Sequence, residues 1–150
     1  MVGLGLQSAD DEIRKVCIRT PLSKEMFLQA HKIIHEFGYS TKCYILLKPP
    51  FLLQKEAIED TVNSAIWLQE QGVEDITICP IRIANGTVLK DLFDKKLYAQ
   101  PKLASLVECL RQLREKKFMP ECLFPVRIVM SWKLLCHQDA NFLRKKYFAA

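Results

Sequence analysis

The sequence lacks several features that define large classes of proteins. No apolar run reaches the roughly 20 residues that a membrane-spanning helix needs, and the N-terminus has no basic-then-apolar secretory signal. We therefore expect a soluble cytoplasmic protein with no membrane partner. The few glycines form no phosphate-binding loop either, because Gly3 and Gly5 lie in a strand pattern without a third glycine that opens a helix.

Closely spaced cysteines are also absent. The nearest pair, Cys109 and Cys122, is 13 positions apart, whereas zinc and cluster motifs bring their ligands within a few positions. Two weaker metal or nucleophile candidates remain open, namely the pair His31 and His35 on one helix and the adjacent Cys136 and His137. The first has no third ligand, and the second has poor geometry for a nucleophile and its base. We therefore interpret the cysteines as reduced thiols, mostly in the core.

Basic charge is concentrated at the C-terminal end. Residues 111–150 hold nine basic and three acidic side chains, whereas residues 1–110 hold 13 basic and 14 acidic ones. This excess, interleaved with aromatic residues, is typical of a surface that contacts RNA phosphates, although a solvated tail has the same composition. We keep both interpretations, a solvated basic tail and an RNA contact at this end.

Apolar runs alternate with helical patterns along the chain, which predicts an α/β fold. The helix predicted after Ser23 has an apolar stripe of Phe27, Ala30, Ile33, Ile34 and Phe37, which we expect to face the core. The short connections favour parallel strands, compatible with about half of a (β/α) barrel or with an open doubly wound sheet. The strands are expected at residues 1–6, 42–47, 75–79 and 124–130, and the helices at about 10–17, 23–37, 54–71, 87–93 and 101–117.

Polar side chains follow each predicted strand. In a parallel sheet they would meet at the carboxyl edge, where ligands bind. Their hydroxyl and amide groups suit ribose, and the cations of Lys48 and Arg82 suit carboxylate or phosphate, although charged residues at strand ends are common without any ligand. The set comprises Gln7, Ser8, Lys48, Cys79, Arg82, Ser131 and Lys133.

Three stretches resemble radical S-adenosylmethionine (radical SAM) proteins. Val2-Gly-Leu-Gly-Leu-Gln-Ser-Ala-Asp-Asp-Glu-Ile-Arg14 is similar to the fourth strand and following turn of that family. Tyr44-Ile-Leu-Leu-Lys-Pro-Pro-Phe51 and Ile78-Cys-Pro-Ile-Arg-Ile-Ala-Asn-Gly-Thr87 resemble the archaeosine-synthase-type subgroup, which modifies a base in transfer RNA. The resemblance covers residues 2 to about 115 and implies the C-terminal half of a TIM-like partial barrel, with strands four to six in residues 1–117 and a basic extension in residues 118–150.

The resemblance also implies a site for S-adenosylmethionine (SAM). It places Gln7 and Ser8 at the cofactor's ribose, and Lys48 with Cys79, Pro80 and Ile81 at its adenosyl part, the last largely through main chain. Arg82 follows directly, and we predict a substrate contact for it from its charge alone, not from the resemblance. Cys43 and Leu47 replace glycines that the wider family has in its fifth strand.

The family's three-cysteine motif C-x3-C-x2-C is missing from this chain, so no residue here is expected to hold the family's 4Fe-4S cluster. Without that cluster the chain should not cleave SAM alone. The favoured interpretation is a truncated or split radical SAM-like protein, whose missing N-terminal half, or a second copy, covers the open sheet edge. The alternatives are an unrelated α/β enzyme and a non-catalytic binding or scaffold module that associates with RNA through its basic end.

Overall fold

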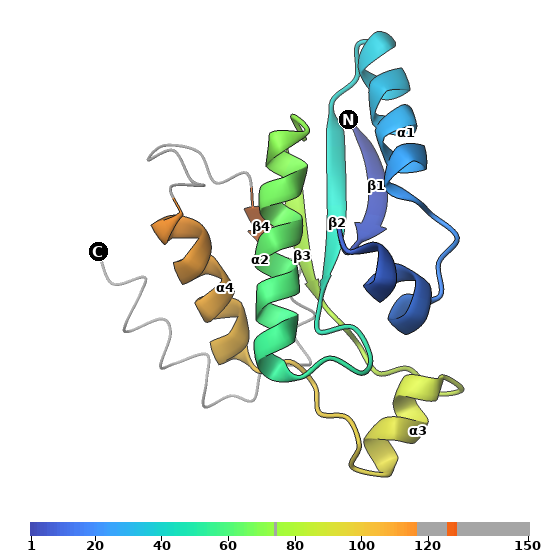
Figure 1. Ribbon diagram of the computed structural model, residues 1–150, viewed down its shortest axis with the longest axis vertical. Coiled ribbons are helices and arrows are strands. Elements are labelled where there is room, and N and C mark those ends of the chain that lie inside the picture. The colour runs from blue at the N-terminus through green and yellow to red at the C-terminus, as the bar shows by residue number, and fades with distance from the viewer. Residues whose placement is uncertain (74, 117–125, 129–150) are drawn as a thin grey trace.

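The computed structural model describes residues 1–73, 75–116 and 126–128. They form a parallel four-stranded sheet whose spatial order follows the order of the chain (Figure 1). The predicted α/β class with parallel βα repeats is therefore confirmed. The strands are β1 (Val2–Gln7), β2 (Thr41–Leu47), β3 (Asp75–Pro80) and β4 (Val126–Ile128).

The helices that cross between strands cover one face of the sheet. α1 packs against β1 and β2, α2 packs against β2 and β3, and α4 packs on α2, while α3 lies beyond the carboxyl ends of the strands (Figure 1). The first expected helix is a π-helix, and the amide of its first residue, Ile13, donates to Asp10 Oδ1 at 3.0 Å. The bounds are η1 (Ile13–Ile18), α1 (Lys24–Glu36), α2 (Gln54–Glu70), α3 (Val88–Asp94) and α4 (Leu103–Glu115).

The core lies between β2 and the helices. Cys43, Ile45 and Leu47 are fully buried on the helix side of β2, whereas Tyr44 between them is 37% exposed on the other side. Successive side chains of a strand point to opposite faces, so the unbroken apolar run of β2 has one buried face and one partly open face. We call the face that carries Tyr44 the inner face of the sheet.

Helix α1 begins and ends where the sequence predicts. The hydroxyl of Ser23 accepts from the amide of Met26 at 3.2 Å, and Gly38, with a φ of 75°, follows the last turn. The predicted core stripe is confirmed in part: Phe27 is buried and Ala30 and Ile34 are partly buried, but Ile33 and Phe37 are 52% and 75% exposed. α1 lies at the β1 border of the sheet, and among the described residues no further strand lies there to cover the rest of its apolar face.

Two predictions concern residues that the structure does not describe. The predicted boundary between residues 117 and 118, and the side chains of Ser131, Lys133, Cys136 and His137, lie outside the described residues. Within the described ranges, none of the helices has the length and apolar character needed to cross a membrane.

The difference between the buried and exposed isoleucines gives a matched test. We expect Ile45→Ala to lower the free energy of unfolding by about 2–5 kcal/mol, because it removes a fully buried side chain from the centre of the core. The same change at the half-exposed Ile33 should cost less than about 0.5 kcal/mol, as surface substitutions do. Urea unfolding of the two variants checks both values, and equal losses would mean that α1 buries its apolar face after all.

Candidate functional site

The carboxyl ends of the first three strands lie at one edge of the sheet. β1 ends at Gln7, Lys48 follows β2, and β3 ends at Pro80. Pro80 pairs with Leu47, and the amide of Ile81 donates to the carbonyl of Leu47 at 3.2 Å. The structure thus places the segment after β3 directly beside the β2–α2 turn, and all three candidate segments share one edge.

Several residues at this edge have an unusual backbone conformation. Gln7, Lys48 and Phe51 adopt left-handed φ values of 69°, 65° and 70°, although none of them is glycine. Such a conformation costs on the order of 1 kcal/mol or more per residue and persists only where the surroundings hold it in place. Glycine would have revealed these positions in the sequence, whereas glutamine, lysine and phenylalanine gave no signal.

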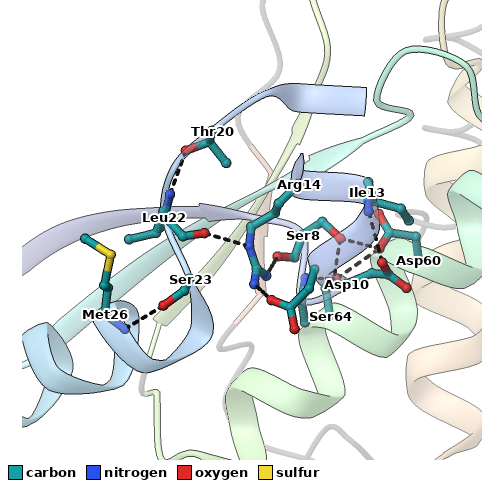
Figure 2. Close-up of polar contacts among 12 residues, drawn as sticks. Ser8, Asp10, Ile13, Arg14, Thr20, Leu22, Ser23, Met26, Asp60 and Ser64 are labelled. Carbon is teal, nitrogen blue, oxygen red and sulfur yellow. Dashed lines mark hydrogen bonds and ion pairs between the residues drawn. The ribbon is translucent and has the colours of Figure 1, made fainter. Parts of the chain in front are cut away.

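Ser8 fastens the end of β1 to helix α2. Its hydroxyl is fully buried, donates to Asp60 Oδ1 at 2.6 Å, and accepts from the amide of Asp10 at 3.0 Å (Figure 2). The next amide, that of Ala9, donates to Ser64 Oγ at 2.7 Å. A hydroxyl has one proton and two lone pairs, so a ribose contact of Ser8, as the resemblance implies, would have to use its remaining lone pair.

Arg14 completes this turn, and sequence reasoning missed it. Its side chain is only 2% exposed although it is charged. Nε donates to the carbonyl of Leu22 at 3.1 Å, one terminal nitrogen donates to the carbonyl of Ser8, and the other pairs with Asp11 (Figure 2). A single arginine in a charged run carries no pattern that distinguishes it from a solvated residue.

Asp60 is the buried carboxyl of this network. Its Oδ1 accepts from Ser8, but its Oδ2 has no hydrogen-bond partner among the described residues. Burial raises the pKa of Asp60 to about 6, because desolvation disfavours the charged form more than the hydrogen bonds from Ser8 and Ser64 favour it. The network therefore contains one group that titrates close to neutral pH.

Lys48 is also engaged within the protein. Its Nζ donates to the carbonyl of Ala99 at 2.6 Å and lies 5.0 Å from the centroid of the Tyr98 ring, while Tyr98 Oη donates to the carbonyl of Lys48 at 2.8 Å. Burial, and secondarily the charge of Lys102, lowers the pKa of Lys48. Lys48 thus ties the β2–α2 turn to the connection between α3 and α4 at the carboxyl edge of the sheet.

The inner face of the sheet is shaped by the glycines of β1. A Cβ atom on Gly3 would lie 3.1 Å from Cε2 of Tyr44, so the tyrosine ring occupies the space that a larger residue would need. The Nζ of Lys42 lies 5.4 Å from the centroid of that ring. Gly5 has only the Nε2 of Gln7 near its Cβ position, at 3.5 Å, which places the Gln7 side chain on the same face.

Two buried oxygens on this face lack a hydrogen-bond partner among the described residues. They are Oε1 of Gln7 and Oγ1 of Thr77, which pairs in register with Tyr44. A buried polar atom left unpaired costs free energy comparable to a lost hydrogen bond. Each of these oxygens can accept a hydrogen bond from a hydroxyl or amino group.

The remaining predicted residues after β3 differ in exposure. Cys79, Pro80 and Ile81 are partly buried, whereas Arg82 is exposed. Their main-chain groups therefore lie at the edge, and the Arg82 side chain is open to solvent beside it.

An iron–sulfur cluster does not fit the described residues. They contain no group of three His, Cys, Asp or Glu side chains that could hold a metal ion. Burial raises the pKa of the Cys43 and Cys109 thiols to about 12, whereas cluster ligands are thiolates. The candidate pair on α1 is also engaged, since Nδ1 of His31 lies 2.9 Å from Oγ1 of Thr41.

The fold matches a solved structure over almost the entire chain. Elp3 of the archaeon Methanocaldococcus infernus superposes with a TM-score of 0.66 at 18% identity, covering 99% of this chain and 37% of that protein. The chain thus has the fold of part of a radical-SAM-type, TIM-like barrel, as predicted. No family model matches the sequence.

Relatives by sequence define the group more narrowly. Archaeosine synthase subunit beta of Thermococcus kodakarensis is 35% identical over 115 residues, covering 77% of this chain and 35% of that protein. The subunit of the same name from Methanosarcina acetivorans is 31% identical over 113 residues, covering 75% and 32%. An uncharacterized protein of Methanocaldococcus jannaschii is 34% identical over 122 residues, covering 81% and 33%.

These alignments confirm the resemblance that the sequence motifs predict. The chain is similar in sequence to archaeosine synthase beta subunits over about three quarters of its length. It spans about a third of the length of the relatives that it matches. Two of these relatives are named beta subunits, which indicates that each belongs to a protein of more than one subunit.

The buried carboxyl predicts a pH dependence of stability. The folded pKa of Asp60, about 6, exceeds the reference value of 3.8, so the native state favours the protonated form. Stability is therefore lost as pH rises from about 4 through about 6 and stays level above that. Because Asp60→Asn cannot ionise, we expect its stability relative to the unchanged protein to grow by up to about 3 kcal/mol between about pH 4 and pH 7.

Urea unfolding at these pH values measures the difference. Asp91→Asn, which removes an exposed carboxyl from α3, is the control and should show no comparable growth. A difference between Asp60→Asn and the unchanged protein that is constant with pH would contradict the raised pKa.

Proposed function

We propose that this chain forms the adenosyl-binding part of a radical SAM-type enzyme that modifies tRNA. The proposal is supported by the similarity to archaeosine synthase beta subunits. It adds that the cluster-binding cysteines are contributed by a polypeptide segment other than these 150 residues, because this sequence has no three-cysteine motif. By itself the chain would then not carry out the reaction.

The observation that carries the proposal is the unpaired acceptor on the inner face. Gln7 has a strained backbone and a buried Oε1 without a partner among the described residues. A ribose hydroxyl would satisfy that oxygen, and main-chain groups of Cys79 to Ile81 at the same edge would contact the adenine. Lys48 would act indirectly, by holding the β2–α2 turn in place beside the cofactor. The exposed Arg82 would bind a substrate phosphate.

SAM supplies the radical chemistry when it is bound at a reduced 4Fe-4S cluster. The residues of this chain bind and orient its adenosyl part in our proposal. Orientation matters because a reacting group held in the right geometry gains several kcal/mol relative to free encounter. A residue of this kind should affect cofactor binding more than it affects stability.

The border of the sheet at β1 is the proposed contact for the complementary segment. Within the described ranges β1 pairs only with β2. Its residues Val2, Gly3 and Gly5 are exposed, and the unpaired backbone groups of such an edge are a template for another strand. A parallel strand from the missing half, or from a second copy, would extend the barrel from this side.

We expect the chain to take up no stoichiometric four-iron cluster after anaerobic reconstitution with iron and sulfide. Among the described residues no three metal-ligating side chains come together, and burial raises the pKa values of the Cys43 and Cys109 thiols. Visible absorption together with iron and sulfide analysis makes the measurement. About four irons per chain would show that the chain assembles a cluster unaided.

Calorimetric titration with SAM tests the site itself. The isolated chain should give no saturable binding in the micromolar range, because only part of the site is present. Binding should appear when the chain is coexpressed with the residues of the M. jannaschii relative that lie outside the matched third. Gln7→Ala should then weaken it at least about tenfold, the equivalent of one hydrogen bond to a ligand, whereas Gln29→Ala on the exposed face of α1 should not.

Either of two results would overturn the assignment. If Gln7→Ala binds SAM as well as the unchanged chain, Gln7 is not part of a cofactor site. If no combination binds SAM, the non-catalytic binding module becomes the better description of the chain.

A further inference from the structure

A mixed apolar and basic surface surrounds α3, next to the proposed cofactor edge. We call it the α3 surface and define it by four exposed apolar side chains and three lysines. The apolar members are exposed by 43–72% although they are large. The set comprises Phe51, Leu53, Phe93, Leu97, Lys95, Lys96 and Lys102.

Hydrogen bonds join the two segments that carry this surface, the β2–α2 turn and the chain around α3. The hydrogen bonds between Lys48 and residues Tyr98 and Ala99 fasten the β2–α2 turn to the chain that follows α3. The amides of Leu97 and Tyr98 both donate to the carbonyl of Leu92, which folds that chain back onto the end of α3. Both segments lie at the same end of the molecule (Figure 1).

The charge of this region differs from that of the chain before it. Residues 81–102 hold five basic and two acidic side chains, whereas residues 1–80 hold eight basic and eleven acidic ones. One acid in the first range, Asp94, is already paired with Lys90 at 2.5 Å. The helix dipole also favours lysines at a helix C-terminus, so these lysines alone would not indicate a binding site. They indicate one here because they lie beside exposed aromatic rings.

Exposed aromatic rings beside lysines match unpaired nucleic acid. Every base has a flat face that stacks on a phenylalanine ring, and lysines neutralise the phosphates between the bases. Protein–protein interfaces, in contrast, are depleted of lysine relative to other surfaces. The side chain of Phe51 is 61% exposed, and its backbone has a left-handed φ of 70°, which costs conformational energy.

We infer that the α3 surface binds an unpaired segment of the RNA substrate, with bases against Phe51 and Phe93 and phosphates against Lys95, Lys96 and Lys102. The inference rests on the proposed function, since it assumes that the substrate is RNA. It assigns the contact to the edge of the sheet and not to the basic C-terminal end that the sequence suggested. RNA bound there would lie beside Ile81 and Arg82, where the cofactor edge begins.

Fluorescence anisotropy with a short single-stranded RNA of mixed sequence, a duplex of the same length and an unmodified tRNA transcript tests the inference on the full chain. The Lys95→Gln/Lys96→Gln double variant should weaken single-strand binding by on the order of tenfold and lower the slope of log affinity against log salt by about 1.4, for two lost phosphate contacts. The matched control, Lys32→Gln/Lys116→Gln, removes the same charge at the C-terminal ends of α1 and α4 and should change neither value.

A second pair of variants separates stacking from charge. Phe51→Ala should weaken single-strand binding by on the order of tenfold with an unchanged salt slope, and the duplex should bind more weakly than the single strand to the unchanged chain. Phe37→Ala removes a ring that is 75% exposed at the far end of α1 and should have no effect. Thermal unfolding should confirm that all four variants are folded.

Equal affinities for the α3 variants and their controls would overturn the inference and return RNA binding to another part of the chain. That result would leave the SAM titration untouched, so failure here is distinguishable from failure of the proposed function. If the chain binds none of the three RNA probes, the inference fails as well.

Discussion

Parallel pairing of β2 with both of its neighbours is the constraint on which the rest of the structure depends. Because β1, β2 and β3 run in the same direction, their carboxyl ends meet at one edge. Because they also lie side by side in chain order, right-handed crossovers place the connecting helices on one face. Burial of Cys43, Ile45 and Leu47 fixes which face that is. Shifting β2 by one residue would turn these side chains toward the inner face, so the register determines the position of the site as well as the core.

The carboxyl edge is held by polar contacts between residues distant in sequence. Ser8 and Asp60 lie 52 positions apart, and Tyr98 lies 50 positions from Lys48. Each contact is buried or partly buried, where an unmade hydrogen bond is most costly. They stabilise the turns after β1 and β2 in conformations that the isolated segments would not adopt.

The strands and helices could be predicted from local patterns, because apolar runs, a serine cap and a glycine stop act within a few residues. The long-range contacts could not, since nothing in a single sequence links Ser8 to Asp60 or marks Arg14 as buried. The apolar stripe of α1 shows a different limit: its period correctly predicts a helix with an apolar face. Whether Ile33 is buried depends on what lies next to β1, which local sequence does not specify.

Two of the three strained residues at the edge, Lys48 and Gln7, differ in how the protein compensates for the strain. At Lys48 the side chain and the carbonyl are both bonded, to Ala99 and Tyr98, so the strain is balanced within the fold. At Gln7 the conformation is equally unusual, yet Oε1 is buried without a partner among the described residues. A cost that the fold does not offset is more readily explained by a ligand than by stability. Sequence position suggested Lys48 as the centre of the site, but on this physical argument Gln7 has the stronger claim.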